Sequence, residues 1–387
     1  MDSRDHTSAR LAEFGTTIFA EMSALAAQTG AINLGQGFPD TDGPASIAEA
    51  AVAAIRGGRG NQYPPGNGVP ELRSAIVRHQ ERFYGVDLDP DSDVLVTAGA
   101  TEGIAAAILS LCGPGDEVVM FEPYYDSYAA CVAMAGGARR VVRLHAPDWT
   151  FDPVALRAAV TNRTRMILLN SPHNPTGRVL TTDELALVAQ VAIERDLIVV
   201  ADEVYEHLAY DRTHVPISTL PGMAERTLSI SSAGKTFSFT GWKVGWVTGP
   251  AALVAAVRGV KQFLTYVNSG PFQYAIAEAL ALPDEYFDGL RLGLRERRDL
   301  LANGLASVGL GAMVPEGGYF VTTDITSLGE ADGMVFCRDL PRRCGVVAIP
   351  SVVFYDDVAA GRSLVRWAFC KHPDVLAEAV ARLARLR

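Results

Sequence analysis

Residues 227–238 read TLSISSAGKTFS, a strand-like apolar run followed by a turn of small residues around one lysine, Lys235. No other charged residue lies in this stretch. A lysine in a dry pocket, or beside a second cation, has a lowered pKa, so more of it is the neutral amine that attacks carbonyl groups and forms Schiff bases. A solvated lysine in a Ser/Gly loop is the alternative interpretation, and the surrounding sequence has to decide between the two.

Short strand-like runs alternate with helical patterns through the middle of the chain. The strand-like runs are 94–98, 117–121, 140–144, 166–170, 197–201, 227–230 and 244–248, and the helical patterns are 101–112, 125–135, 153–160 and 182–195. This alternation predicts an α/β fold with a mainly parallel, seven-stranded sheet between helices. Ligands of such sheets bind outside the carboxyl ends of the strands, so residues that follow a strand are the candidates for a site.

The flanking segments predict further helices and a second, smaller unit. Helices are expected near 18–27, over 46–56 with Ser46 as N-cap and Glu49 completing a capping box, and over 70–84, 250–267 and 272–282. Beyond Pro283, a charged helix at 286–307 leads into strands at 319–325, 346–349 and 364–369 and a closing helix at 373–386. We therefore predict an N-terminal arm that forms part of the small domain (1–45), a large domain (46–282) and a small C-terminal α+β domain (283–387).

Composition and charge argue against several classes of function. The 387 residues carry a net charge of −10 and no basic run, which disfavours binding to nucleic acid or to a membrane surface. No apolar run is long enough to span a membrane, and the polar N-terminus lacks the apolar core of a signal peptide. The five cysteines form no C-x-x-C and the seven histidines no H-E-x-x-H, so we predict no metal site. We expect a soluble, cytoplasmic protein.

Two strand ends carry features that suit a phosphorylated, aromatic ligand. Residues 94–103, VLVTAGATEG, predict a strand, a glycine turn and a helix start, whose free N–H groups suit a phosphate. Residues 121–128, FEPYYDSY, place tyrosines after the next strand, where one of them can lie on a flat ring. Taken alone, an ordinary strand–helix turn and core packing explain these two motifs at least as well.

Two further strand ends carry polar side chains. Residues 169–177, LNSPHNPTG, contain two X-Pro bonds, one or both of which can be cis, and a rigid turn here would aim the Asn174 amide at a ligand oxygen. Asp202 ends an apolar run, where a carboxylate is costly unless it is paired with a cation such as a protonated pyridine nitrogen. Tyr205, three residues later, can donate to a ring oxygen. A helix-capping aspartate is the alternative for Asp202.

The last group of candidates is a hydroxyl and two cations. Ser232 and Lys243 can complete a phosphate site, with Lys243 acting as a point charge. Arg366 lies in an apolar strand-like run, where a guanidinium calls for a carboxylate that its planar fork binds at two points. An arginine on the exposed face of an edge strand is the alternative. Together, these features and Lys235 predict a site for pyridoxal phosphate and an amino acid.

The motifs resemble those of the fold-type-I, pyridoxal-phosphate-dependent aminotransferases of class I/II. The resemblance runs from about Phe14 to the C-terminus and is greatest to the kynurenine/glutamine transaminase branch, which includes actinobacterial N-succinyldiaminopimelate aminotransferase-like proteins. It is carried by NLGQGFPD (33–40), NQYPPG (61–66), VTAGATEG (96–103), EPYYDSY (122–128), NSPHNPTG (170–177), ADEVYEHL (201–208), SSAGKTFSFTGWKVGW (231–246) and LVRWAFCK (364–371).

The resemblance implies a role for each of these residues. Lys235 forms the Schiff base with the cofactor and shuttles the proton, while Asp202 pairs with the pyridinium nitrogen. Arg366 binds the substrate α-carboxylate, with Gly37 and Asn174 beside it. The other implied cofactor contacts are Asn174 and Tyr205 at the ring hydroxyl, Tyr125 on the ring face, Ala100, Thr101, Ser232 and Lys243 at the phosphate, and Tyr63 from the partner subunit. Sites shared between subunits imply a homodimer.

The chain departs from the kynurenine-type pattern at two places. Asn268 and Ser269 stand, just before Pro271, where those enzymes usually carry an aromatic residue and a histidine. A tryptophan often found in the N-terminal pocket wall is absent, with Thr17 and Ile18 in that region. Both changes predict a less aromatic pocket wall and leave room for a longer, polar substrate. Whether Asn268 and Ser269 line the partner's pocket stays open.

The implied reaction is a ping-pong transamination between an L-amino acid and a 2-oxo acid. The amino donor is expected to be N-succinyl-LL-diaminopimelate or an amino acid of the glutamine, methionine or kynurenine type. The same machinery also permits β-elimination from cysteine conjugates, as in a C–S β-lyase. An S-x-x-K acyl hydrolase built on Ser232 and Lys235 leaves the other motifs unexplained, and a regulator that only binds an effector requires a DNA-binding domain for which the segment before Phe14 is too short.

Overall fold

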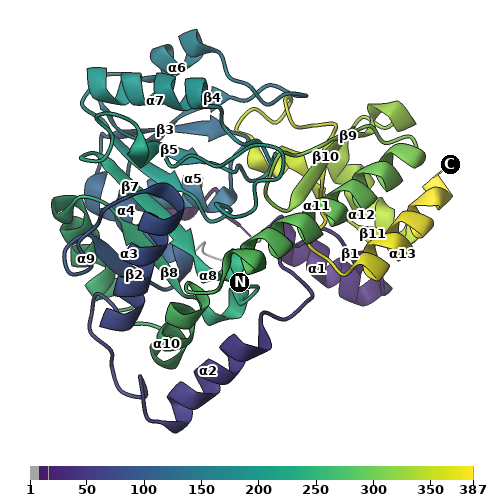
Figure 1. Ribbon diagram of the computed structural model, residues 1–387. Helices are drawn as coiled ribbons and strands as arrows, with labels where there is room; N and C mark the ends of the chain where they lie inside the picture. The colour runs from purple at the N-terminus through teal and green to yellow at the C-terminus, as the bar shows by residue number, and fades with distance from the viewer. Residues whose placement is uncertain (1–7, 16, 387) are drawn as a thin grey trace, which may run out of the picture.

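A central sheet and its helices form the larger part of the computed structural model, which describes residues 8–15 and 17–386 (Figure 1). The strands of the central sheet are β2 (Val94–Thr97), β3 (Glu117–Glu122), β4 (Ala138–Arg143), β5 (Thr164–Asn170), β6 (Ile198–Asp202), β7 (Thr227–Ser232) and β8 (Gly245–Thr248). These seven strands lie in the order β2-β8-β7-β6-β5-β3-β4. Only β8 runs antiparallel to its neighbours, which confirms the predicted, mainly parallel sheet.

Helices cover both faces of this sheet, and alternate residues of each strand point toward opposite layers. On β3, Val118 and Met120 belong to one buried cluster, whereas Val119 and Phe121 belong to another. Strands that are buried on both faces appear in the sequence as continuous apolar runs, and for this reason these strands could be predicted from the sequence. The helices of this part of the molecule are α3 (Pro70–Tyr84), α4 (Gly99–Leu111), α5 (Asp126–Ala135), α6 (Pro153–Ala159), α7 (Thr182–Glu194), α9 (Ala251–Leu264) and α10 (Gly270–Ala279), together with α2 (Ala45–Arg56), which packs on α10.

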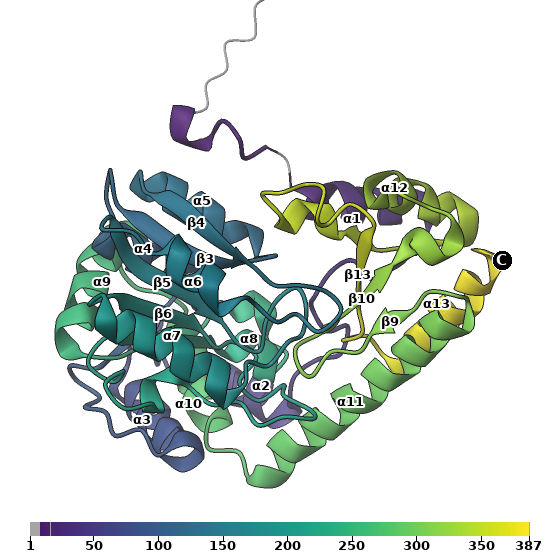
Figure 2. The same cartoon turned by 90° about the horizontal axis from the view of Figure 1, so that it is seen from above.

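A second, antiparallel sheet lies beside the first (Figure 2). Its strands are β9 (Ala312–Met313), β10 (Phe320–Asp324), β12 (Ile349–Pro350) and β13 (Leu364–Ala368), in the order β12-β13-β10-β9. Four helices pack around it, namely α1 (Ile18–Thr29), α11 (Asp284–Ser307), α12 (Gly333–Cys344) and α13 (Pro373–Leu383). A short parallel pair, β1 (Ile32–Asn33) with β11 (Val346–Val347), joins the N-terminal segment to the C-terminal one.

The structure corrects several local expectations. Helix α2 begins at Ala45 with Pro44 as N-cap and no side-chain cap, so the capping box of Ser46 and Glu49 is wrong. Strands β1 and β9 and helix α12 were not predicted, and the strand expected over 346–349 is divided between β11 and β12. The domain boundaries after residues 45 and 282 stay a prediction. Within residues 8–15 and 17–386, no helix has both the length and the apolar character to cross a membrane.

Candidate active site

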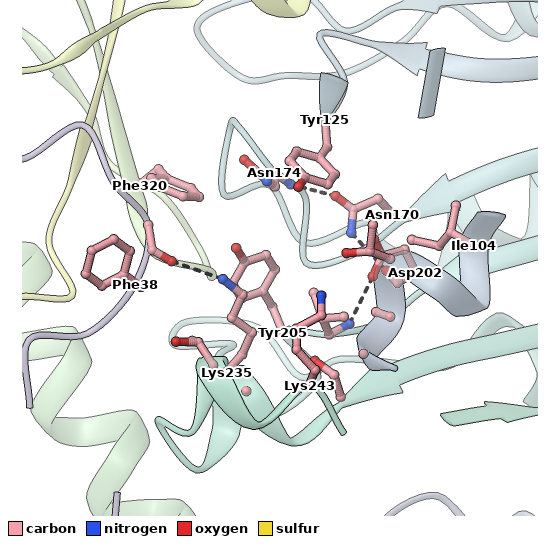
Figure 3. Close-up of a pocket in the computed structure, with 18 of the residues that line it drawn as sticks. Phe38, Ile104, Tyr125, Asn170, Asn174, Asp202, Tyr205, Lys235, Lys243 and Phe320 are labelled. Carbon is pink, nitrogen blue, oxygen red and sulfur yellow. Dashed lines mark hydrogen bonds between the residues drawn. The ribbon is translucent and has the colours of Figure 1, made fainter. Parts of the chain in front are cut away.

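A cavity of about 330 Å³ lies between the carboxyl ends of the central strands and the second sheet (Figure 3). It collects side chains from both sheets and from the N-terminal segment. The predicted site residues that line it are Gly37, Ala100, Thr101, Tyr125, Asn174, Asp202, Tyr205, Ser232, Lys235, Lys243 and Arg366. The location agrees with the rule for parallel sheets, because β6 and β7 end at Asp202 and Ser232.

Lys235 projects into the cavity from α8 (Ala233–Thr236), a single turn that follows β7 directly. Its Nζ donates a hydrogen bond to the carbonyl oxygen of Gly37 at 3.0 Å. Burial lowers the pKa of Lys235, with the nearby cations Arg366 and Lys243 acting in the same direction and Cys370 and Asp202 opposing them. The neutral amine that the sequence predicted is therefore favoured by the surroundings.

Asp202 ends β6 and is 4% exposed. Tyr128 Oη donates to its Oδ2 at 2.5 Å, and the Val204 N–H donates to its Oδ1 at 3.3 Å. Burial raises the pKa of Asp202 to about 6, against the opposing effect of these hydrogen bonds. Lys235 lies near enough to lower the pKa of Asp202, but among residues 8–15 and 17–386 no lysine or arginine lies within ion-pair distance of it, so a further cation placed in the cavity would stabilise its charge.

A second part of the cavity suits an anion. Ala100 and Thr101 lie in the first turn of α4, which starts directly at the cavity. Lys243 extends over this turn, since a Cβ added at Gly99 would come within 3.1 Å of Lys243 Nζ. The Ser232 hydroxyl lines the same region. Helix N–H groups, a hydroxyl and an ammonium group thus surround one space, as in phosphate sites at helix N-termini.

Arg366 comes from the middle of β13 and is 2% exposed. Its Nη1 donates to Asn174 Oδ1 at 3.0 Å and its Nη2 to the Gly35 carbonyl oxygen at 3.1 Å, while Nε has no hydrogen-bond partner among the described residues. The Phe320 ring stacks 3.8 Å from the guanidinium carbon. Burial lowers the pKa of Arg366 to about 10. No described carboxylate forms an ion pair with this side chain, so it fits a carboxylate brought in by a ligand.

Asn174 and the two predicted tyrosines lie close to these charges. Both X-Pro bonds of the 169–177 loop are cis, and the Asn174 N–H donates to Asn170 Oδ1 at 2.7 Å. Tyr125 precedes α5 and lies edge-on to Tyr128, with 5.7 Å between ring centroids. Tyr205 is buried, and its ring centroid lies 5.6 Å from Lys235 Nζ.

Tyr63 does not reach the cavity of its own chain. It is 81% exposed and lies edge-on to Tyr266, with 5.6 Å between ring centroids. Its implied contribution to a partner subunit stays a prediction. Asn268 and Ser269 also lie outside the cavity lining, and their side chains contact backbone carbonyl groups of the same chain.

Sequence reasoning missed several residues of the site. Asn170 lines the cavity, donates to the Asp202 carbonyl oxygen at 2.8 Å and accepts from the Asn174 N–H. Its place at the end of a strand was the signal that could have found it. Three phenylalanines that the sequence reasoning did not name, Phe19, Phe38 and Phe320, also line the cavity. Phe19 follows directly on Thr17 and Ile18, the two positions that suggested a less aromatic wall.

One group of possible metal ligands lies apart from the cavity lining. His79, Glu206 and His207 place one ligand atom each within 4.8 Å of the others. Several of their polar atoms have partners: the two imidazole Nε2 atoms are 2.7 Å apart, and Glu206 Oε1 accepts from Ser231 Oγ at 2.5 Å, whereas His79 Nδ1 has no partner among the described residues. This arrangement is that of a buried hydrogen-bond network, and the predicted lack of a metal stays a prediction.

Comparisons with known proteins identify the family of this chain. The model of the family "aminotransferase class I and II" matches residues 29–383. A Mycobacterium tuberculosis protein, named probable N-succinyldiaminopimelate aminotransferase, is 52% identical over 98% of each chain. A solved structure of the N-succinyldiaminopimelate aminotransferase of that organism has a TM-score of 0.96, with 98% of this chain and 100% of that chain covered.

Two more distant relatives agree. The methionine aminotransferase of Escherichia coli is 41% identical over 97% of each chain, and its solved structure has a TM-score of 0.94 over 98% of this chain and 99% of that chain. The mouse kynurenine–oxoglutarate transaminase 3 is 38% identical, with 95% of this chain and 87% of the mouse protein covered. This chain therefore belongs to the class I and II aminotransferase family: it is an aminotransferase with the fold-type-I architecture of those enzymes.

Proposed function

We propose that this aminotransferase binds pyridoxal phosphate in the cavity and moves an amino group between an L-amino acid and a 2-oxo acid by a ping-pong mechanism. The observation that carries the proposal is the convergence of Lys235, Asp202 and Arg366 on one cavity from α8, β6 and β13. These residues offer an amine for the cofactor aldehyde, a carboxylate for its ring nitrogen and a guanidinium for the α-carboxylate of a substrate.

The charges of the cavity support this ligand. Asp202 is a buried anion that forms no ion pair with a described cation, and Arg366 is a buried cation that forms none with a described carboxylate. A ligand with a protonated ring nitrogen and a substrate with a carboxylate would each neutralise one of them. A phosphate would accept from the first turn of α4 and from Lys243, at the third point of the cavity.

Each protein group then has a defined task. Bound pyridoxal phosphate supplies an electron sink for the charge that forms at the substrate α-carbon. Asp202 keeps the ring nitrogen protonated, and Lys235 Nζ, as the neutral amine, takes the proton from the α-carbon. Because that amine must be neutral, we expect turnover to fall as the pH drops below the pKa of Lys235. Tyr205 and Asn174 orient the ring hydroxyl of the cofactor.

The remaining cofactor contacts follow from position. We assign the ring face to Tyr125 and the phosphate to Ala100, Thr101, Ser232 and Lys243. Gly37 lies beside the substrate carboxylate, and no side chain fits there, because a Cβ would come within 2.2 Å of the Phe320 ring. We also propose that Tyr63 acts in the cavity of a second copy, as part of a cytoplasmic homodimer. Its exposure on its own subunit supports that arrangement.

The substrate is proposed to be an α-amino acid with a long side chain. The names of the relatives point to N-succinyl-LL-diaminopimelate or to an amino acid of the methionine, glutamine or kynurenine type. The aromatic wall of Phe19, Phe38 and Phe320 would pack on the apolar part of such a chain.

A panel of amino donors, assayed with pyruvate and with 2-oxoglutarate as acceptors, tests this proposal. We expect transfer from at least one of the named donors, with kinetics in which the donor leaves as a 2-oxo acid before the acceptor binds. Pyruvate release from a cysteine conjugate without any acceptor would instead favour the C–S β-lyase. No transfer and no elimination after loading with pyridoxal phosphate would contradict both.

A further inference from the structure

Lys243 has a backbone conformation that side-chain-bearing residues rarely adopt. Its φ and ψ are 53° and 47°, in the left-handed region. A residue other than glycine stays in this region only where its surroundings hold it there. The groups that contact the Lys243 backbone therefore decide where its ammonium group lies.

Two polar side chains make those contacts. Ser269 Oγ lies 2.8 Å from the carbonyl oxygen of Trp242 and 3.1 Å from that of Lys243, and its one proton is shared between these two acceptors. Asn268 Nδ2 donates to the carbonyl oxygen of Thr97 at 2.9 Å and lies 3.4 Å from that of Lys243. Both carbonyl groups of the Trp242–Lys243 turn are thus bonded from the same two-residue segment.

The Asn268 contact joins the two parts of the anion site. Thr97 is the last residue of β2, directly before the turn into α4. The Asn268 side chain therefore contacts both the end of β2, through the Thr97 carbonyl group, and the segment that carries Lys243, through the Lys243 carbonyl group. The two sides are tightly packed, because a Cβ added at Gly245 would come within 2.7 Å of the Ala100 nitrogen.

The segment that carries Asn268 and Ser269 is itself held in place. Gln273 Nε2 donates to the Asn268 carbonyl oxygen at 2.6 Å, and Lys261 Nζ donates to the Tyr266 carbonyl oxygen at 2.9 Å. Ser269 also has a left-handed backbone, with φ of 53°. A loop anchored at several points can fix the turn that it contacts.

We infer that Asn268 and Ser269 are positioning residues, whose side chains hold Lys243 so that its ammonium group stays at the beginning of α4. The inference rests on the proposed function, in which this ammonium group contacts the cofactor phosphate. Their replacement should weaken binding of the phosphate and leave binding of the ring unchanged.

The test compares two ligands on cofactor-free protein: pyridoxal phosphate and pyridoxal, which lacks the phosphate. We expect Ser269→Ala and Asn268→Ala each to weaken binding of pyridoxal phosphate by roughly 10-fold, the size of one lost hydrogen bond to a buried carbonyl group. Binding of pyridoxal should stay within about twofold of wild type. In a Lys243→Ala background, neither replacement should weaken pyridoxal phosphate binding any further.

Controls separate this inference from the proposed function. Ser307 Oγ also donates to a backbone carbonyl group, that of Gly304 at 2.7 Å, but it ends α11, so Ser307→Ala should leave both affinities unchanged. Equal weakening of both ligands, unaltered affinity for both, or full additivity with Lys243→Ala would overturn the positioning role. If wild-type protein does not prefer pyridoxal phosphate to pyridoxal, the proposed function itself fails.

Discussion

The two sheets contribute to the cavity in different ways. At the carboxyl ends of the central strands, both carboxylate oxygens of Asp202 accept hydrogen bonds and Lys235 Nζ donates one. On the second sheet, Arg366 holds a guanidinium whose Nε is buried without a partner among the described residues. We interpret the site at Asp202 and Lys235 as one for a group that stays bound, and the site at Arg366 as one for a carboxylate that binds and is released in each reaction.

A second buried arginine makes this contrast clearer. Arg298 of α11 is 4% exposed, about as buried as Arg366, yet it bonds Asp211 and Asp299. A buried arginine that serves the fold brings its own carboxylates. The lack of such a partner at Arg366 is therefore the feature that marks it as a binding residue, and the predictions below test the two sites separately.

The largest effect is expected at the central sheet. Lys235→Ala should lower turnover by about 10⁴-fold, because both the nucleophile and the proton acceptor are lost. The protein should still fold and retain pyridoxal phosphate through the phosphate and ring contacts. Stopped assays of donor conversion, with circular dichroism as the folding control, measure this. Turnover close to wild type would reject the role of Lys235.

On the second sheet, Arg366→Ala should lower kcat/KM for the amino donor by about 10³-fold, the size of two lost hydrogen bonds to a charged group. Affinity for pyridoxal phosphate should change little. Arg366→Lys should recover only part of the loss, because an ammonium group cannot bind a carboxylate at two points. The matched variant Arg298→Lys should lower thermal stability and leave KM unchanged. A comparable rise in KM for both arginine variants would remove the contrast between them.

Asp202→Asn should lower kcat by about 100-fold or more, because a neutral amide no longer favours a protonated ring nitrogen. In contrast with the Arg366 variants, the KM for the amino donor should change little. Steady-state kinetics across several donors measure both values. A loss that appears only in KM would place Asp202 with the substrate, not with the cofactor.

The smallest effect concerns Glu203, which points away from the cavity. Burial, with the nearby charge of Glu206, raises the pKa of Glu203 from 4.5 to about 8. The folded protein therefore keeps a proton that the unfolded chain loses, so this stabilisation is complete below about pH 4.5 and is lost as the pH rises to about 8. In the cofactor-free protein, the Tm of Glu203→Gln relative to wild type should be about 2 °C higher at pH 8 than at pH 5.

The control for this last experiment is Glu296→Gln, since Glu296 lies on the exposed face of α11. It should leave the pH dependence of Tm unchanged. If the Tm of the Glu203 variant depends on pH as the wild-type Tm does, the pKa of Glu203 does not differ between the folded and the unfolded protein.

The sequence predicted the central sheet well and the second sheet less well, for a physical reason. Strands buried on both faces give continuous apolar runs such as 118–121, whereas β9 of the second sheet and β1 of the separate β1–β11 pair are two residues long and pair with segments outside their own local sequence. Helix α2 has Pro44 as N-cap without a side-chain hydrogen bond, and α12 contains an interior proline, Pro341, which argues against a helix even though Asp332 caps its start and Gly345 its end.

The site followed the same rule. Residues placed by a strand end, such as Asp202 and Ser232, were predictable from sequence, and the structure brings them to the cavity. Asn268 and Ser269 were not, because their contacts with Lys243 and Thr97 join segments more than a hundred residues apart or depend on a left-handed turn. Phe19 reaches the cavity wall from a helix that packs with the second sheet, which the local sequence does not reveal.

The central claim is that Lys235 is the residue that reacts with the aldehyde of pyridoxal phosphate. Reduction of the loaded protein with borohydride, followed by proteolysis and mass spectrometry, tests it directly. The account predicts one stoichiometric pyridoxyl adduct on the peptide that contains Lys235, and none on that peptide in Lys235→Ala. An adduct distributed over surface lysines, or no adduct after full loading, would contradict it.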